Sequence, residues 1–342
     1  MDGSGAINVS FERGQMRVKL WGVITARVLD HCLSAIGTQR EIAAGTSVTE
    51  EIVLDLSNVA LIKDSGAISI VCLCSAFMSG KLQDLVNPTS IYLKLPSQNV
   101  LNYLMRIGFF SQMEKNAGLL GHGEQIKLEE RMKEIDDEKA EKSTWDDSVY
   151  REGAPIIWPM KIIGHKERQY VPRDFETACQ RLVRDASKRF QRLLSFPQFS
   201  FSKEDTHNFL GANYELYMNV YEHSGSWGLA MIHAQPRVGT FLCCYDIGVG
   251  IRQSVNASEN VPAPFDRDED AIRWAVMEGH SSKIGGNGAG LAIIEDFAFD
   301  KAGILEIRSG TCLMQKTPKN NTWKSYIVPW FPGTQINIII PA

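Results

Sequence analysis

Three short groups of polar and glycine residues between Glu215 and Leu291 have the side-chain types that bind and activate phosphates. The first group is Glu215, Asn219 and His223, which are spaced four residues apart and share one face of a helix. An amide oxygen suits a Mg²⁺ site in which phosphate oxygens and water supply most ligands, so Asn219 is the candidate magnesium ligand. A nearby carboxylate can deprotonate an attacking water or hydroxyl, which makes Glu215 the candidate general base. The alternative is a polar helix face that binds nothing.

The second group is Asp246, Gly248 and Gly250, which directly follows the apolar run 240–245. A carboxylate at the end of a strand can accept a hydrogen bond from an amino group such as that of adenine. The two glycines allow the backbone to approach a flat ligand closely. This group therefore predicts contacts to a nucleotide base, with a capped turn as the alternative.

The third group is a glycine-rich run that includes Gly286, Gly288 and Gly290 and continues into an apolar helix from Leu291. Glycines at a helix N-terminus offer backbone N–H groups and a favourable dipole to phosphate, so this run predicts a phosphate-binding loop. It is not a Rossmann signature, because no buried strand precedes it, and the chain contains no P-loop motif. The alternative is a flexible loop without a ligand.

The pattern around these groups predicts helices packed on a mostly antiparallel sheet, which is an α+β arrangement. Helices are expected at 174–194, 203–223, 268–278 and 291–299, and strands at 155–163, 227–233, 240–245, 304–308, 323–328 and 334–340.

The first third of the chain alternates strands with helices, which predicts an α/β domain. Residues 7–22 have the pattern of a hairpin around Gly14. Further strands are expected at 51–57 and 90–95, and helices at 28–36, 67–78 and 98–107. The stretch that follows is dense in charge of both signs, which predicts a linker or a solvated helix.

Length and composition predict about two soluble globular domains, since the chain has 342 residues with 44% hydrophobic and 22% charged residues. The net charge of −4 gives no reason to expect a nucleic-acid partner. The N-terminus lacks a signal-peptide pattern, and the longest apolar run, 68–78, is too short to span a bilayer. We therefore expect a cytoplasmic protein without a membrane partner. Its seven cysteines show no paired zinc spacing, which favours buried reduced thiols.

Residues 5–115 resemble the STAS domain of bacterial anti-sigma-factor antagonists. The resemblance rests on Ile52–Val59, on Ile62-Lys-Asp-Ser-Gly66 and on Leu101–Phe110. It implies that Ser65 occupies the position that is phosphorylated in that family. The alternative is that Asp64 or Ser65 caps the helix that follows.

The three polar groups, in this order and with a strand or helix beneath each, resemble the GHKL ATPases, which include DNA gyrase, histidine kinases and anti-sigma serine kinases. The resemblance covers about residues 160–342. It implies that Asn219 holds Mg²⁺, that Asp246 recognises adenine and that the glycines of the third group surround the phosphates. Like the anti-sigma serine kinases, this chain has a glutamate, Glu215, four residues before the asparagine.

Two further correspondences follow from the same resemblance. The closing strand 333–341 carries Thr334 at the position that supports the aspartate and adenine. Residues 252–285 correspond to the mobile lid of the family, in which Ser282 and Lys283 would reach phosphate. No histidine has the setting of a phosphoacceptor, so a conventional sensor histidine kinase is not expected.

Together these features predict a STAS-like domain at 1–118, a charged linker or helix at 119–155 and a GHKL-type domain with a Bergerat-type α/β sandwich at 156–342. The expected function is a bacterial-type signalling regulator that binds Mg-ATP and either hydrolyses it or phosphorylates a serine. A STAS-like or signalling protein is the expected partner, and a homodimer is considered. A non-catalytic ATP sensor or scaffold and a dimeric ATPase clamp remain the alternatives.

Overall fold

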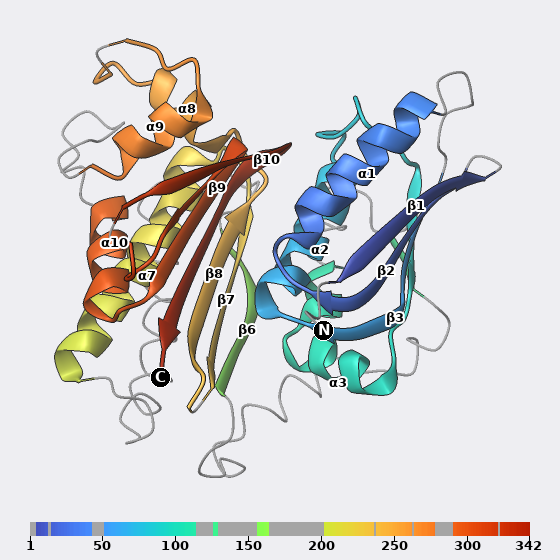
Figure 1. The fold of residues 1–342 in the computed structure, drawn as a ribbon, viewed down its shortest axis with the longest axis horizontal. Helices are drawn as coiled ribbons and strands as arrows, with labels where there is room; N and C mark the ends of the chain where they lie inside the picture. The colour runs from blue at the N-terminus through green and yellow to red at the C-terminus, as the bar shows by residue number, and fades with distance from the viewer. Residues whose placement is uncertain are drawn as a thin grey trace, which may run out of the picture. The chain divides into compact units, whose positions relative to one another are not determined.

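The computed structural model describes residues 5–12, 15–42, 51–113, 126–128, 156–163, 202–235, 237–261, 263–277, 290–320 and 322–342. The chain divides into two compact units, residues 1–150 and residues 151–342. Each unit contains its own five-stranded sheet. The predicted combination of two sheets with helices is therefore confirmed (Figure 1).

The first unit has a sheet in the order β1-β2-β3-β4-β5, in which β1 is antiparallel to β2 and the other neighbours are parallel. The strands are β1 (Ala6–Glu12), β2 (Gln15–Ile24), β3 (Glu51–Ile62), β4 (Ser90–Lys94) and β5 (Ile126–Leu128). The helices are α1 (Val28–Ile42), α2 (Asp64–Met78) and α3 (Gln98–Arg106). Strand β5 lies within the stretch interpreted as a linker, so part of that stretch completes the sheet.

Strand β2 shows why this chain forms a half-buried sheet. Met16, Val18 and Leu20 are buried, whereas Arg17 and Lys19 between them are exposed. Because successive strand side chains point to opposite faces, one face of β2 packs in the core and the other carries the charges.

Helix α2 is buried along its whole length except at Ser65, which is half-buried. The predicted cap by Asp64 or Ser65 is wrong, because the residue that caps α2 is Lys63 and its side chain makes no capping hydrogen bond. Asp64 is instead the first helical residue, and its buried carboxylate accepts a hydrogen bond from the Tyr103 hydroxyl. That contact fixes the first turn of α2 against α3.

The second unit has a fully antiparallel sheet in the order β6-β7-β8-β10-β9. Its strands are β6 (Ile156–Ile163), β7 (Gly228–Gln235), β8 (Gly239–Asp246), β9 (Ile304–Lys316) and β10 (Lys324–Pro341). Its described helices are α7 (Lys203–His223), α8 (Gly250–Asn256), α9 (Asp268–Ala275) and α10 (Gly290–Asp300). Helices α7 and α10 lie on the same face of the sheet (Figure 1). The helix expected at 174–194 lies outside the described residues.

The last two strands differ from the prediction. The segments expected as two strands at 323–328 and 334–340 form the single strand β10, and β9 continues to Lys316. The pairing of β9 with β10 shifts register on both sides of Phe331. Pro329 and Pro332 lie at these shifts, where a residue without an N–H interrupts the ladder without ending the strand.

Within the described ranges, none of the helices is long and apolar enough to cross a membrane. The cysteines in these ranges are all buried. Burial raises the pKa of the Cys74 thiol to about 12 and that of Cys312 to about 11. The expected reduced, buried thiols are therefore present at these positions.

Candidate functional site

Helix α7 begins with a capping box, which fixes the residue at which the helix starts. Ser202 Oγ accepts a hydrogen bond from Asp205 N at 3.0 Å, and Asp205 Oδ2 accepts one from Ser202 N at 2.7 Å. Burial favours the neutral acid, but hydrogen bonds from Lys301 and Ser202 outweigh it and hold the pKa of Asp205 below its usual value. Since Lys301 follows α10, the same carboxylate joins the start of α7 to the end of α10.

The buried face of α7 packs on the sheet and on α10. Its buried residues include Phe209 and Leu216, and the rings of Phe209 and Phe297 of α10 lie 5.6 Å apart. Leu216 O accepts a hydrogen bond from the Cys244 thiol on β8 at 3.8 Å. These contacts to α10 and to β8 hold α7 in one rotation about its axis.

The first and third sequence groups meet where α10 begins. A Cβ atom added to Gly290 would lie 2.8 Å from Glu215 Oε2 and 3.8 Å from Asn219 Oδ1. Both side chains are half-buried. Because both lie close to Gly290, they border the N-terminus of α10. Leu291, the next residue, is also half-buried. Glu215, Asn219 and the N-terminus of α10 therefore lie close together.

The second group meets the end of the chain at Asp246. This buried carboxylate accepts a hydrogen bond from Gly248 N through Oδ1 at 2.7 Å, which fixes its orientation at the end of β8. Gly333 on β10 has a φ of +83°, and a Cβ atom there would lie 2.6 Å from Asp246 Oδ1. Only glycine both adopts this positive φ readily and leaves out the Cβ atom that would collide with Asp246. Thr334, which follows, is half-buried and pairs with Ser309 of β9.

The first and second groups are joined at the C-terminal end of α7. Val249 N donates a hydrogen bond to Ser224 O at 2.9 Å, so the turn after Asp246 is bonded to Ser224, the C-cap residue of α7. On β7, Gly228 pairs with Asp246, and a Cβ atom on Gly228 would lie 2.9 Å from Val220 Cγ1. Asn219, the neighbour of Val220, is thereby brought to the same end of the sheet as Asp246.

Ser309 is a site residue that the sequence did not indicate. Its buried hydroxyl accepts a hydrogen bond from Ile251 N at 2.8 Å and donates one to Gly333 O at 3.2 Å. It therefore joins β9, the start of α8 and the glycine that touches Asp246. Gly250 supports this arrangement, because its φ of +79° turns the chain into α8 beside the serine hydroxyl. A single serine within a strand carries no sequence signature that would reveal its role in joining these three segments.

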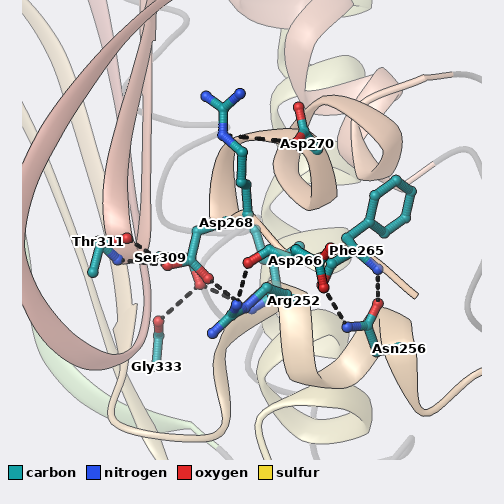
Figure 2. A network of polar contacts seen from close by, with 11 residues as sticks. Arg252, Asn256, Phe265, Asp266, Asp268, Asp270, Ser309, Thr311 and Gly333 are labelled. Atoms are coloured by element: carbon teal, nitrogen blue, oxygen red, sulfur yellow. Dashed lines mark hydrogen bonds and ion pairs between the residues drawn. The ribbon is translucent and has the colours of Figure 1, made fainter.

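A second polar network fixes the segment from α8 to α9, and Figure 2 shows it at close range. Asp268 Oδ2 accepts hydrogen bonds from Thr311 N and Thr311 Oγ1, both at 2.8 Å. Asp268 Oδ1 pairs with Arg252 Nε at 2.9 Å. Asn256 exchanges two hydrogen bonds with the backbone of Phe265, at 2.8 and 2.9 Å. The segment is therefore closed on itself by Asn256 and attached to β9 by Asp268.

The remaining predicted residues fall into two sets. His223 is the last residue of α7, and its Nε2 atom lies 3.9 Å from Glu222 Oε2. Four predicted phosphate contacts lie outside the described residues: Ser282, Lys283, Gly286 and Gly288.

This arrangement gathers a carboxylate, an amide oxygen and a helix N-terminus at one point, with a second, oriented carboxylate at the end of the neighbouring strand. Groups of the first three kinds can hold a metal-bound phosphate, and a carboxylate such as the fourth can accept a hydrogen bond from a nucleotide base. In comparisons with known proteins, no family model matches the sequence and no curated protein matches it significantly.

Proposed function

We propose that the second unit binds Mg-ATP in the manner of a GHKL ATPase and that Glu215 activates the attacking group. The observation that carries the proposal is that the side chains of Glu215 and Asn219 lie beside Gly290 at the start of α10. A triphosphate at this helix N-terminus would receive backbone N–H groups, and its Mg²⁺ would take Asn219 Oδ1 as a ligand.

The base would bind beside Asp246. Its carboxylate is held by Gly248 N, so it need not reorganise to accept a hydrogen bond from an exocyclic amino group. The backbone of Gly333 packs against this carboxylate, where a Cβ atom would crowd it, and Thr334 follows on the same strand. These features favour adenine over a base that presents only an acceptor at that position.

Glu215 would act as a general base on water, which gives hydrolysis, or on a serine hydroxyl, which gives protein phosphorylation. Hydrolysis is the first proposal, because it needs only the groups at this site. One observation favours phosphorylation as a second candidate: Ser65 is the one residue of α2 that is not buried. The carboxylate of the neighbouring Asp64 accepts a hydrogen bond from the Tyr103 hydroxyl, which directs its charge toward the interior of the first unit. The resemblance assigns this unit to the STAS domain.

The experiment is to incubate the protein with Mg²⁺ and γ-labelled ATP and to measure free phosphate and protein-bound label. Glu215→Gln should lower either product by about 10²- to 10⁴-fold, which is the usual contribution of a general base, while ATP still binds. Asp246→Asn should weaken ATP binding itself, because an amide can present its donor to the adenine amino group.

Each outcome has a distinct meaning. Free phosphate alone supports hydrolysis, whereas label that maps to Ser65 supports the kinase. Binding without either product supports a non-catalytic sensor and removes the role of Glu215. Unchanged ATP affinity in Asp246→Asn would show that the site is assigned wrongly.

A further inference from the structure

The hairpin formed by the end of β9 and the start of β10 extends beyond the sheet. Strand β8 pairs with β10 only over Gln335–Pro341, whereas β9 also pairs with Lys324–Ile327. We call residues 311–331 the arm. Among the described strands, none other than β9 pairs with the arm part of β10, so one edge of Lys324–Val328 has no strand neighbour in the described part of the chain.

Contacts to the helices fix the arm in place. Glu269 of α9 accepts hydrogen bonds from Arg273 and from Ser325 of the arm, and these bonds hold the pKa of Glu269 below its usual value. Lys316 pairs with Glu295 of α10, and its Nζ atom lies 4.1 Å from the centre of the Phe299 ring. The arm is therefore a preformed edge, not a segment that must order on binding.

Large apolar side chains are exposed on this anchored arm. Ile327 is 97% exposed, and Tyr326 and Trp330 are 44% and 49% exposed. Three exposed large apolar residues within five positions are unusual on the surface of a protein unless a partner covers them. Pro329 lies between Val328 and Trp330 and lacks an N–H, which limits the edge available for pairing to Lys324–Val328.

The charge of this part of the chain is one-sided. Residues 307–342 contain no aspartate or glutamate, although the whole chain has a net charge of −4. The lysines of the arm are Lys316, Lys319 and Lys324, and the last two are exposed. Glu295 already pairs with Lys316, so Lys319 and Lys324 are the exposed cations that favour an acidic ligand at the arm, and a second arm of another copy would meet like charge.

We propose that the arm binds an extended, acidic segment of a partner protein, which adds as a strand to the outer edge of Lys324–Val328. Main-chain hydrogen bonds to the edge would give affinity, and Ile327 and its aromatic neighbours would give specificity for alternating apolar side chains. A polypeptide fits better than a lipid surface, because only a polypeptide pairs with backbone N–H and C=O groups along an edge. The proposal does not depend on the nucleotide.

The test uses a displayed library of short random peptides, selected on the full chain and, in parallel, on Ile327→Ser. Since Ile327 is almost fully exposed, this substitution leaves the core intact. The matched control is Val238→Ser, which removes an apolar side chain that is 51% exposed in the turn between β7 and β8. We expect enriched peptides that combine acidic residues with alternating β-branched or aromatic residues.

The enriched peptides should bind Ile327→Ser at least about tenfold more weakly than the unsubstituted chain and bind Val238→Ser normally. Lys324→Glu should weaken them as well, and hydrogen exchange should show new protection of the amides of Lys324–Val328. Peptides that bind Ile327→Ser equally well, or no enrichment, would overturn the proposal. Ile327-dependent binding to phosphatidylglycerol vesicles without amide protection would show a lipid surface instead, and Ile327-dependent dimerisation would show a second copy.

Discussion

Replacing Gly290 by alanine places a methyl group in the space that borders the Glu215 carboxylate. The new Cβ atom would lie 2.8 Å from Oε2, whereas ordinary contacts begin at 3.4 Å. The carboxylate must therefore move by about 0.6 Å, and a displacement of this order at a reacting group costs up to about 10²-fold in rate. Asn219 Oδ1, at 3.8 Å from the new atom, keeps an ordinary contact.

The expected result of Gly290→Ala is a loss of turnover with Mg-ATP binding largely retained. Turnover should fall by about 10- to 100-fold, because Glu215 is displaced while the metal ligand stays in place. Stability should change by less than about 1 kcal/mol. The flexible carboxylate yields to the methyl group, and alanine has the higher helix propensity by about 1 kcal/mol at most.

The assay combines phosphate release with calorimetric binding of a non-hydrolysable ATP analogue. Gly211→Ala is the matched control, because Gly211 lies on the same helix as Glu215 and a Cβ atom there would meet nothing within 4 Å. This control should keep full turnover and gain about 1 kcal/mol of stability. Full turnover in Gly290→Ala would refute the reasoning, since it would show that the position of Glu215 does not matter for the reaction.

Three further changes test other parts of the structure. Ser309→Ala should lower stability by about 1–3 kcal/mol and weaken ATP binding, measured by urea unfolding and calorimetry, since Ser309 joins three segments at the site. Tyr103→Phe should cost about 1.5–3 kcal/mol by removing a donor to the buried Asp64, and hydrogen exchange should locate the loss in α2. Hydrogen bonds, chiefly from Arg273, lower the pKa of Glu269, so its contribution to the free energy of unfolding should be complete above about pH 4.3 and be lost progressively as the pH falls from there through the lowered pKa. Glu269→Gln should flatten this pH dependence of unfolding, and an unchanged acid transition would contradict the assignment.

The helix expected at about 203–223 matches α7, where local signals and the packing pattern agree. Ser202 and Asp205 form a capping box, and the apolar positions have helical spacing up to His223. The same agreement gave β7 and β8, whose short connection favours antiparallel pairing. The positions of two candidate residues followed from this, since the expected helix carries Glu215 and the expected strand leads into Asp246, as in the structure.

The arm and Ser309 could not be predicted in the same way. The prolines of β10 read as strand breaks, but the strand continues because it bulges around Phe331 while it keeps β9 as its partner. Helix α8 has two turns and begins at a glycine, so it lacks an apolar period long enough to detect. Strand β5 is three residues long and is defined only by its pairing with β4. These elements depend on tertiary contacts that no local pattern encodes.

The contacts of Asp268 bear on how a lid could move at the candidate site. The resemblance assigns residues 252–285 to a mobile lid, but β9 holds this segment at Asp268 and also holds Ile251, the residue just before it. Ser309 accepts the Ile251 N–H at the start of α8, and Asp268 binds both Arg252 and Thr311 at the start of α9. Hydrogen bonds to a charged group contribute about 1.5–3 kcal/mol each, so release of α9 would cost several kcal/mol and would populate the open state in fewer than about one molecule in a hundred. Helices α8 and α9 should therefore move with the sheet, and any motion that admits nucleotide must leave the Asp268 contacts in place.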